Sequence, residues 1–361
     1  MRITALECRD FRNLAGSEIA IGGGITVLHG PNGAGKTNLL EALYFGLTSH
    51  SFRAGSDRDA IRFDAPSARV ELVLEADAGR PTRLLAGIDR AGERRHLLDG
   101  RPLERADQRP LVSVFHPDRL QLLKGPPAQR RAHLDRFVGA LRPSRGDLRS
   151  RFGRTLAQRN ALVARVRAGE ATIDSLATWD ERLAAEAEPL IEARAAAVVA
   201  LDQPFTGRAA ELGLADAGIA YRPRAEGDAA AIVARLAQLR EGDLGRSYTT
   251  FGPQLDEVVL RAGGRQLRRF GSQGQQRVAL LALLFAERDA MLAEGRPAPL
   301  MLLDDVMSEL DLERRGLLID ALAGAGQAVV TATESAHVPP AQDAFAVAVS
   351  DGATRALAAA A

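Results

Sequence analysis

An eight-residue stretch near the N-terminus has the residue types and spacing of a phosphate-binding loop. Its residues, in order, are Gly30-Pro31-Asn32-Gly33-Ala34-Gly35-Lys36-Thr37. An apolar strand is expected before it and a helix after it, so backbone N–H groups and the helix N-terminus could surround an anion. In such a loop Lys36 reaches the β- and γ-phosphates of a nucleotide, and Thr37 binds Mg2+. A chance glycine-rich turn is the alternative.

Two adjacent carboxylates, Asp304 and Asp305, directly follow the apolar run Leu300–Leu303. The run predicts a buried parallel strand, and carboxylates beside such a strand are costly unless something uses them. We expect Asp304 to hold Mg2+, usually through water, and Asp305 to orient or deprotonate an attacking water. Without the phosphate loop, the same pattern could be a strand that ends in a polar turn.

A third polar group opens a helix in the second half of the chain, in the order Gly271-Ser272-Gln273-Gly274-Gln275-Gln276-Arg277. Ser272 is a residue type that favours the N-cap position. Helix N–H groups behind small polar residues could bind a second anion. An ordinary helix cap is the alternative.

The helix that follows the loop is expected over 36–47, after strands at 2–7, 17–21 and 25–29. Further strands are expected within 68–98 and at 111–115, 255–260, 300–303 and 328–330. Helices are expected near 130–141, 148–166, 179–201, 229–239 and 312–322, and a frayed tail over 355–361. The simplest architecture is a split α/β domain, 1–123 plus 243–361, with an inserted all-helical lobe over 124–242. Pro143, Gly169, Pro189 and Pro204 are expected to break the inserted helices.

The basic residues are unevenly distributed. The stretch Lys124–Arg167 holds twelve Lys or Arg and two Asp, although the whole chain has a net charge of +1. A one-sided basic surface is typical of binding to a nucleic-acid backbone. Few aromatic residues lie between the charges, which favours duplex over single-strand binding. The candidate DNA contacts are Lys124, Arg145, Arg149, Arg151 and Arg154. A solvated helix face neutralised by acids near 181–192 is the alternative.

Composition excludes several classes of protein. The chain has 361 residues with 46% hydrophobic and 26% charged residues, which is typical of a globular protein of about two domains. A single cysteine, Cys8, excludes a disulfide framework. The six histidines show no metal-ligand spacing, and no apolar run is long enough to span a membrane. The N-terminal residues do not resemble a signal peptide, so we expect a cytoplasmic protein.

Together, the three motifs resemble those of the ATP-binding-cassette (ABC) ATPases of the SMC/RecF branch. The resemblance implies an α/β P-loop ABC-type ATPase head with an antiparallel β subdomain and an inserted helical lobe. It implies ATP and Mg2+ as cofactors, with Lys36 and Asp305 catalytic and with Thr37 and Asp304 at the metal. Asn38 and the loop residues would contact the nucleotide. Ser272, Gln273, Gly274 and Gln275 resemble the family signature, which acts on the nucleotide of the opposite subunit.

Further stretches resemble the RecF family in order and spacing: Asp10–Leu14, Gly30–Glu41, Phe115–Asp118, Leu123–Pro127, Gly271–Arg277 and Leu302–Asp311. The resemblance implies an ATP-dependent recombination mediator that dimerises on duplex DNA, binds double-stranded DNA and single/double-strand junctions, and works with RecO and RecR. Weak, DNA-stimulated ATP hydrolysis would release it. It would support recombinase loading at gapped or stalled replication sites and take part in repair, replication and the SOS response.

Two departures from the family pattern leave residue roles open. The family stretch Gly-Pro-His-Arg-Asp-Asp resembles Gly252–Glu257, where Gln254 and Leu255 replace the histidine and arginine. Where many transporter ATPases have a switch histidine, this chain has Thr331-Ala332-Thr333, and either threonine could sense the γ-phosphate.

Three other functions use similar motifs. A transporter motor would need a surface for membrane partners, and the basic run argues against it. The ATPase partner of a repair nuclease would need a long coiled coil, which the broken insertion does not supply. A nucleotide-sensing scaffold would bind RecR without hydrolysis, and the Asp304-Asp305 pair argues against that.

Overall fold

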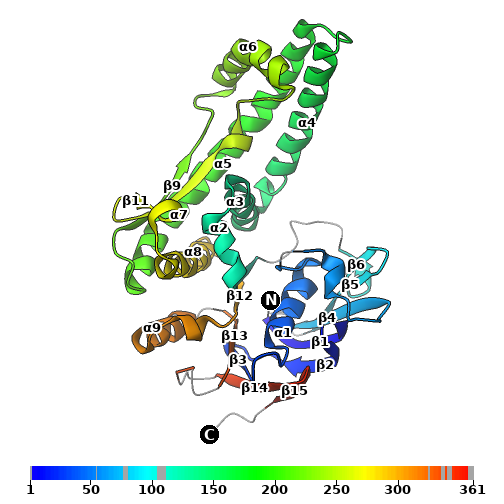
Figure 1. The fold of residues 1–361 in the computed structure, drawn as a ribbon, viewed down its shortest axis with the longest axis vertical. Coiled ribbons are helices and arrows are strands. Elements are labelled where there is room, and N and C mark those ends of the chain that lie inside the picture. Colours follow the sequence, from blue (N-terminus) through cyan, green and yellow to red (C-terminus); the bar gives the residue numbers. More distant parts are fainter. Residues whose placement is uncertain are drawn as a thin grey trace. The chain divides into compact units, whose positions relative to one another are not determined.

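The computed structural model describes residues 2–53, 55–75, 80–103, 111–323, 326–334, 338–339 and 344–356. The chain forms two compact units (Figure 1). The first comprises residues 1–120, 211–213 and 280–361, and the second comprises residues 121–210 and 214–279. Among the described residues, no helix combines the length and apolar character that crossing a bilayer requires.

The first unit contains a six-stranded antiparallel sheet with strand order β2-β1-β4-β5-β6-β7. Its strands are β1 (Arg2–Phe11), β2 (Leu14–Ala20), β4 (Ser67–Glu75), β5 (Pro81–Asp89), β6 (Arg94–Leu98) and β7 (Arg101–Pro102). Burial alternates along β1, β2 and β5, as expected for a sheet with one face on the core. The antiparallel subdomain predicted from the 68–98 region is therefore present.

A second, mostly parallel sheet in this unit has the order β15-β14-β3-β13-β12-β8. Its strands are β3 (Ile25–His29), β8 (Val112–Phe115), β12 (Leu300–Leu303), β13 (Ala328–Ala332), β14 (Phe345–Ser350) and β15 (Ala353–Ala356), of which only β15 is antiparallel to its neighbour. The central strands are buried along their whole length, which explains their uninterrupted apolar sequences.

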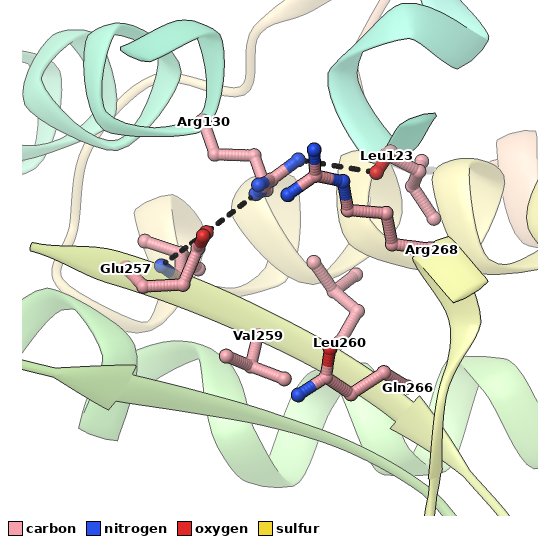
Figure 2. Close-up of a pocket in the computed structure, with 8 residues that line it drawn as sticks. Leu123, Arg130, Glu257, Val259, Leu260, Gln266 and Arg268 are labelled. Carbon is pink, nitrogen blue, oxygen red and sulfur yellow. Dashed lines mark hydrogen bonds and ion pairs between the residues drawn. The ribbon is translucent and has the colours of Figure 1, made fainter. Parts of the chain in front are cut away.

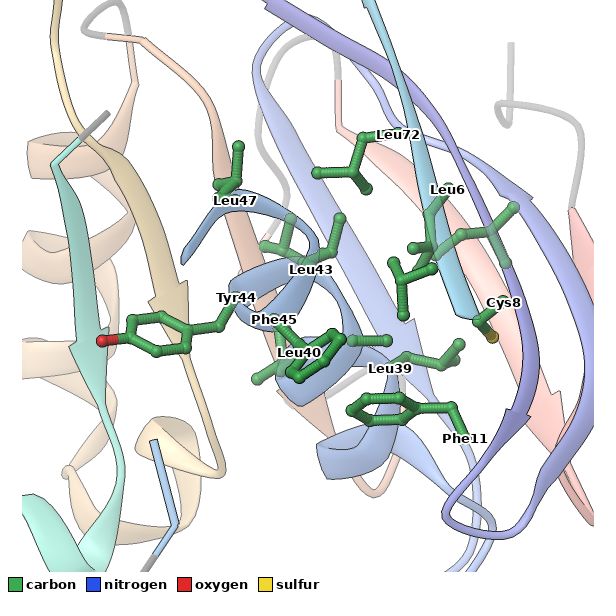
Figure 3. Packing of buried hydrophobic residues seen from close by; sticks show 14 of the residues in the cluster. Leu6, Cys8, Phe11, Leu39, Leu40, Leu43, Tyr44, Phe45, Leu47 and Leu72 are labelled. Carbon is green, nitrogen blue, oxygen red and sulfur yellow. The ribbon is translucent and has the colours of Figure 1, made fainter. Parts of the chain in front are cut away.

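Helix α1 (Lys36–Thr48) forms the core of the first unit. Every residue from Leu39 to Leu47 is buried, so this helix is covered on all sides. Figure 3 shows its side chains among those of Leu6, Phe11 and Leu72 from the antiparallel sheet. Cys8 lies in the same cluster, and burial raises the pKa of its thiol to about 11, so it is an inert core residue.

The remaining elements of this unit connect or cover the sheets. They are the 3-10 helices η1 (Asp57–Ala60), η3 (Pro117–Leu120) and η7 (Val306–Glu309), helix α9 (Leu312–Leu322) and the second part of α8 (Gln273–Ala293). The observed α9 and β12 have the predicted bounds, and α1 and β13 differ from the prediction by one and two residues at their ends.

The second unit consists mainly of helices (Figure 1). They are α2 (Gln121–Lys124), α3 (Pro127–Leu141), η4 (Pro143–Arg145), α4 (Leu148–Arg167), η5 (Ile173–Ser175), α5 (Leu176–Glu211), α6 (Ala229–Arg246), η6 (Pro253–Leu255) and α7 (Leu267–Phe270). A small antiparallel sheet, β11-β10-β9, completes it, with β9 (Ala217–Arg222), β10 (Glu257–Ala262) and β11 (Arg265–Gln266).

Two details of the predicted insertion differ from the structure. Region 124–242 is not entirely helical, because β9 lies within it and pairs with β10 over six residues. Residues 243–279 also belong to the second unit, whereas the sequence pattern predicts them in the split α/β domain. The short run 217–222 sits between helices, and its strand partner is distant in sequence, so local pattern could not reveal it.

The expected breaks at Pro189 and Pro204 are wrong, because α5 runs through both as one 36-residue helix. A proline inside a helix costs about 3 kcal/mol. The apolar stripe of α5 continues across both positions, with Leu183, Leu190 and Phe205 almost fully buried. We infer that this burial offsets the two prolines.

The C-terminal end of the first unit contains structure that the sequence analysis missed. Strand β14 lies beside β3, and β15 turns back on β14. Residues 355–356 of the expected frayed tail belong to β15, and residues 357–361 lie outside the described part of the chain.

A buried ion network links the long helices of the second unit. Arg159 of α4 is fully buried and donates to Asp180 of α5 and Asp243 of α6, each at 2.8 Å. It also donates to Thr249 at 2.7 Å. Arg240 donates to the other oxygen of Asp180 at 2.7 Å. Removing the central cation would leave buried carboxylates without their partner.

We therefore expect Arg159→Met to lower the free energy of unfolding by about 3–5 kcal/mol, the usual cost of breaking a buried ion pair. Urea unfolding measures this. The matched control is Arg165→Met on the same helix, because Arg165 pairs with Glu170 at 3.9 Å while both are mostly exposed. That change should cost less than about 1 kcal/mol. Equal losses for the two variants would contradict the network's role.

Candidate functional site

The carboxyl ends of four parallel strands meet at one edge of the second sheet. Leu303 of β12 pairs with Phe115 of β8 and with Val330 of β13, so the residues that follow each of them stand side by side. Strand β13 in turn pairs with β3, which ends at His29 directly before the phosphate loop. This register brings the loop, Asp304 and Thr331 together, in agreement with the rule that ligands bind at the carboxyl edge of such sheets.

The phosphate loop presents an open helix terminus. The N-cap of α1 is Gly35 in the left-handed region, at φ 107°, and no side chain caps the first turn. The first N–H groups of α1 are therefore available to an anion. Gly30 fits only without a side chain, because a Cβ there would lie 2.1 Å from the carbonyl oxygen of Val349. The turn between β14 and β15 also holds the loop, because the Gly352 N–H donates to Ala34 O at 2.9 Å.

The side chain of Lys36 folds back onto the phosphate loop. Its Nζ donates to the carbonyl oxygens of Gly30 at 2.7 Å and Pro31 at 3.0 Å. Partial burial lowers the pKa of Lys36, and the nearby carboxylates of Asp305 and Asp304 oppose that shift. The ammonium group is thus held at the loop beside the two acidic residues, and its contact with phosphates stays a prediction.

A chain of hydrogen bonds connects the two predicted metal residues. Thr37 Oγ1 lies 3.0 Å from both carboxylate oxygens of Asp304. Thr331 Oγ1 donates to Asp304 Oδ1 at 2.8 Å and accepts from the N–H of Asp305 at 2.8 Å. Asp304 is buried, whereas Asp305 is exposed in the left-handed region, at φ 49°. Thr331 thus links the Asp304 carboxylate to the backbone of Asp305, and this contact couples Thr331 to the site.

His116 belongs to this cluster, and the sequence analysis gave it no chemical role. Its Nε2 lies 3.4 Å from Asp304 Oδ2, and its Nδ1 accepts from the Asp118 N–H at 3.2 Å. Burial lowers the pKa of His116, and the carboxylates of Asp304 and Asp118 oppose the shift. The signal in the sequence was its position directly after a strand, but the strand order that brings it to Asp304 could not be read there.

A second group missed by the sequence analysis lies at Glu41 in α1. This side chain is fully buried and accepts three hydrogen bonds from Arg12, at 2.7–3.2 Å. Arg53 Nη1 lies 3.2 Å from Glu41 Oε2, and Ser51 Oγ donates to Glu41 Oε1 at 2.7 Å. The carboxylate therefore fixes two partly exposed arginines beside α1. This contact explains why Arg12 occurs in the 10–14 motif.

Asn13 of the same motif reaches the start of α1. Its Oδ1 accepts from Asn38 Nδ2 at 2.6 Å, so Asn38 is tied to the β1–β2 turn. A nucleotide contact by Asn38 remains a prediction, because its amide is engaged by the protein itself.

The signature residues lie in the second unit, at the start of α8. Ser272 Oγ accepts from the Gln275 N–H at 3.2 Å, and Gln275 Oε1 accepts from the Ser272 N–H at 3.0 Å. This reciprocal pair is a capping box. Ser272, Gln273, Gly274 and Gln275 are all exposed. The Ser272 hydroxyl proton is not used in the cap, so the group can still donate to a ligand.

The basic run divides into paired and unpaired residues. Arg151 pairs with Glu186 at 3.0 Å, and Arg149 lies 3.6 Å from Asp135. Arg145 and Arg154 are exposed, and their side chains make no ion pair or hydrogen bond with any residue that the structure describes. Lys124 is half-buried. The surface therefore offers fewer free cations than the sequence count of twelve, because Arg130 and Arg159 are also buried.

A shallow pocket in the second unit explains how the loop at Lys124 is held. Figure 2 shows Arg130 between Glu257 and the carbonyl of Leu123. Arg130 donates to Glu257 at 2.8 Å and to the carbonyl oxygens of Leu123 and Gly125 at 3.1 and 2.9 Å. Since its donors are used inside the fold, Arg130 is a structural residue and fixes the turn that carries Lys124.

The described residues contain no group of three or more His, Cys, Asp or Glu side chains placed to hold a metal ion. Thr37 and Asp304 nevertheless supply the hydroxyl and carboxylate oxygens that Mg2+ favours. They lie next to an open helix terminus suited to phosphate oxygens, which can complete such a site. The residues present therefore fit a metal that arrives with a nucleotide, and they do not form a protein-only metal site.

Comparison with known proteins gave consistent results. The sequence model of the RecF/RecN/SMC N-terminal domain matches residues 2–355. The DNA replication and repair protein RecF of Roseiflexus castenholzii is 35% identical, over 92% of this chain and 93% of that protein. The protein of the same name from Anaeromyxobacter sp. strain Fw109-5 is 38% identical, over 94% of this chain and 95% of that protein.

Solved structures match over almost the whole chain. The recombination mediator protein RecF-ATPrS in the RecFOR pathway has a TM-score of 0.83 and 25% identity, covering 99% of this chain and 98% of that chain. The Smc head domain from Pyrococcus furiosus bound to the C-terminal domain of ScpA has a TM-score of 0.60 and 17% identity, covering 99% and 96%. These matches confirm the predicted P-loop ABC-type head fold.

The phosphate-loop prediction is tested by Lys36→Arg. We expect normal folding but loss of ATP binding, because a broad guanidinium fork would crowd the phosphates where a compact ammonium fits. Equilibrium binding of a fluorescent ATP analogue measures this. Lys124→Arg is the matched control, since the chain has only these two lysines, and it should bind ATP normally. Near-normal ATP affinity of Lys36→Arg would rule out this assignment of the loop.

Proposed function

This chain belongs to the RecF family of the RecF/RecN/SMC proteins, and on that premise we propose that it is an ATP-dependent, DNA-binding recombination mediator in DNA repair and replication. The observation that carries the proposal is the contact of Thr37 with Asp304 beside the open N-terminus of α1. A contact between the phosphate loop and the acidic strand end is what a nucleotide switch requires.

Each residue of the site has a defined task. The first N–H groups of α1 and the Lys36 ammonium bind the phosphates, while Thr37 and Asp304 hold the metal. When bound, ATP would supply a transferable phosphoryl group, and Mg2+ would neutralise the negative charge that develops on that group. Asp305 is exposed next to Asp304 and orients or deprotonates the attacking water. Thr331 holds the Asp304 carboxylate and the Asp305 backbone in place, and hydrolysis is slow and stimulated by DNA.

Dimerisation uses the signature in the second unit. Ser272 and Gln275 are exposed and fixed by their capping box, so a second copy of the chain can present them to the bound nucleotide of the first. Two copies with two nucleotides between them would form an ATP-gated clamp. Hydrolysis then weakens the contact between the copies and releases the clamp.

The DNA surface lies on α4 and the preceding turn. Arg145 and Arg154 are exposed without protein partners, so they can neutralise phosphates of a duplex without breaking existing contacts. Arg149, Arg151 and Lys124 would support them. Backbone contacts of this kind carry no sequence information, so binding would follow DNA structure, such as single/double-strand junctions, more than sequence.

The partners follow from the relatives. The solved structure of 25% identity is a recombination mediator of the RecFOR pathway. We propose that this chain likewise works in the cytoplasm with RecO and RecR to support recombinase loading at gapped or stalled replication sites, including during the SOS response.

The clamp is tested by sedimentation velocity with and without ATP and duplex DNA. We expect ATP to convert monomer to dimer in the wild type. Ser272→Arg should bind ATP as a monomer yet fail to dimerise, because Ser272 meets the nucleotide only across the interface. The control is Ser272→Thr, which keeps the cap and the hydroxyl and should still dimerise. Dimerisation of Ser272→Arg with ATP would disprove the proposed dimer, in which Ser272 of one copy contacts the nucleotide of the other.

Asp305→Asn should trap the clamp on DNA. Removing the group that activates water should slow hydrolysis about 100- to 10,000-fold, while Asp304, Lys36 and Thr37 still hold the nucleotide. Phosphate release measures the chemical step. Dimer lifetime after dilution of ATP measures the trap, and wild type with a non-hydrolysable analogue separates slow chemistry from tighter binding. Hydrolysis at the wild-type rate would place the catalytic carboxylate elsewhere.

DNA binding is tested by the double variant Arg145→Ala/Arg154→Ala. Duplex affinity should fall uniformly across sequences, and the slope of log affinity against log salt should flatten by about 0.9 for each lost phosphate contact. Fluorescence anisotropy over a salt series measures both. Arg235→Ala, an exposed arginine on α6, is the control. An unchanged slope would identify the run as a solvated helix face.

A further inference from the structure

The antiparallel sheet of the first unit has an outer face that turns away from the core and carries charged side chains. Leu6 and Cys8 of β1 lie in the hydrophobic core. Because side chains alternate between the two faces of a strand, Glu7 and Arg9 lie on the outer face. Both are exposed, and neither side chain makes a hydrogen bond or an ion pair with any residue that the structure describes.

The strand register sets like charges side by side on this outer face. Glu7 stands directly opposite Glu18 of β2 on one side and Glu71 of β4 on the other. Two positions further along β1, Arg9 stands directly opposite Arg69 of β4. Like charges that oppose each other across strands destabilise a sheet. The pattern therefore does not serve the stability of the single chain.

Only part of this charge is neutralised inside the chain. Glu71 pairs with Arg69 at 2.7 Å and with Arg83 at 2.5 Å. Glu18 is exposed, and its side chain, like that of Glu7, has no partner among the described residues. An acidic row and a basic row thus remain next to each other, about 7 Å apart along the strands. A nucleic-acid backbone would meet both signs at once, which does not suit it as a wholly basic surface does.

The charge pattern is complementary to itself. A second copy can be turned by 180° about an axis that crosses the strands between the two rows. Glu7 of each copy then faces Arg9 of the other. Because Cys8, Val70 and Ala86 lie level in the register, the same rotation sets Arg83 of β5 against Asp89 of the second copy. The strands of the two sheets stay aligned, as in ordinary face-to-face packing, and a two-fold interface requires this kind of self-complementary surface.

From this pattern we propose that the outer face of the antiparallel sheet is an interface between two copies of this chain that forms without nucleotide. Strands β2, β1, β4, β5 and β6 lie about 4.8 Å apart, and rows about 7 Å apart, so the face covers about 600 Å2 on each copy. That area is at the low end for specific complexes, so the association is weak and falls with added salt. Where the ATP-gated clamp forms, a step that rests on the proposed function, each clamp carries two such faces, and they join neighbouring clamps.

The test is sedimentation velocity without nucleotide, at low salt and at protein concentrations up to about 100 μM, the range suited to a weak complex. The wild type should form a dimer. Glu7→Arg and Arg9→Glu should each weaken self-association at least about 10-fold, because like charges then face each other twice in the dimer. An equimolar mixture of the two variants should associate as well as the wild type, since every facing pair again has opposite charges.

Folding is controlled by urea unfolding of both variants. Neither should be less stable than the wild type, because each reversal turns like-charge pairs across the strands into opposite-charge pairs. Glu226→Arg makes the same change of charge at an exposed position in the second unit and should associate as the wild type does.

A wild type that stays monomeric over this concentration range, or a mixture of the variants that does not associate, would overturn the inference. So would a face that binds DNA instead, shown by lower duplex affinity of Arg9→Glu and higher duplex affinity of Glu7→Arg without self-association. Because no nucleotide is present in the sedimentation experiment, failure of the ATP-gated clamp would leave its result unchanged.

Discussion

The contact between Thr37 and Asp304 joins the two halves of the site. Thr37 lies in the first turn of α1 and Asp304 directly follows β12, and the two residues are 267 positions apart in the chain. The contact exists because β12 and β3 flank β13 in a parallel sheet, so their carboxyl ends lie at the same level. Thr331 then links the Asp304 carboxylate to the backbone N–H of Asp305, so these two groups are held together. The phosphate loop and the carboxyl end of β12 are therefore in direct contact.

Buried ion pairs, and not a strand-end site, connect the elements of the second unit. Its helices are held by buried ion pairs, at Arg159 with two aspartates and at Arg194 with Asp135 and Asp256. Tyr221 donates to Asp256 as well, and burial raises the pKa of Asp256. Such pairs require a defined geometry more strictly than apolar contacts do. They join α4 to α5 and α6, and α5 to α3.

The sequence predicted those parts of the site that are contained in local motifs. Lys36, Thr37, Asp304 and the N-cap at Ser272 lie in the expected elements because strand, loop and helix signals are close together in the chain. The roles of His116 and Glu41 were missed, because their partners come from strand order and from the β1–β2 turn. Strand β9 and the pairing of β14 with β3 were missed for the same reason. The continuity of α5 through Pro189 and Pro204 was missed because burial outweighed local preference.

The position of β3 between β13 and β14 has a consequence for synthesis of the chain. The phosphate loop is encoded within the first forty residues, yet both strands that flank β3 come from beyond residue 327, and Gly352 closes onto Ala34. On the ribosome, the loop sequence is therefore synthesised long before the strands that fix the conformation of the loop. The loop can therefore take its observed form only after the residues up to Gly352 have emerged.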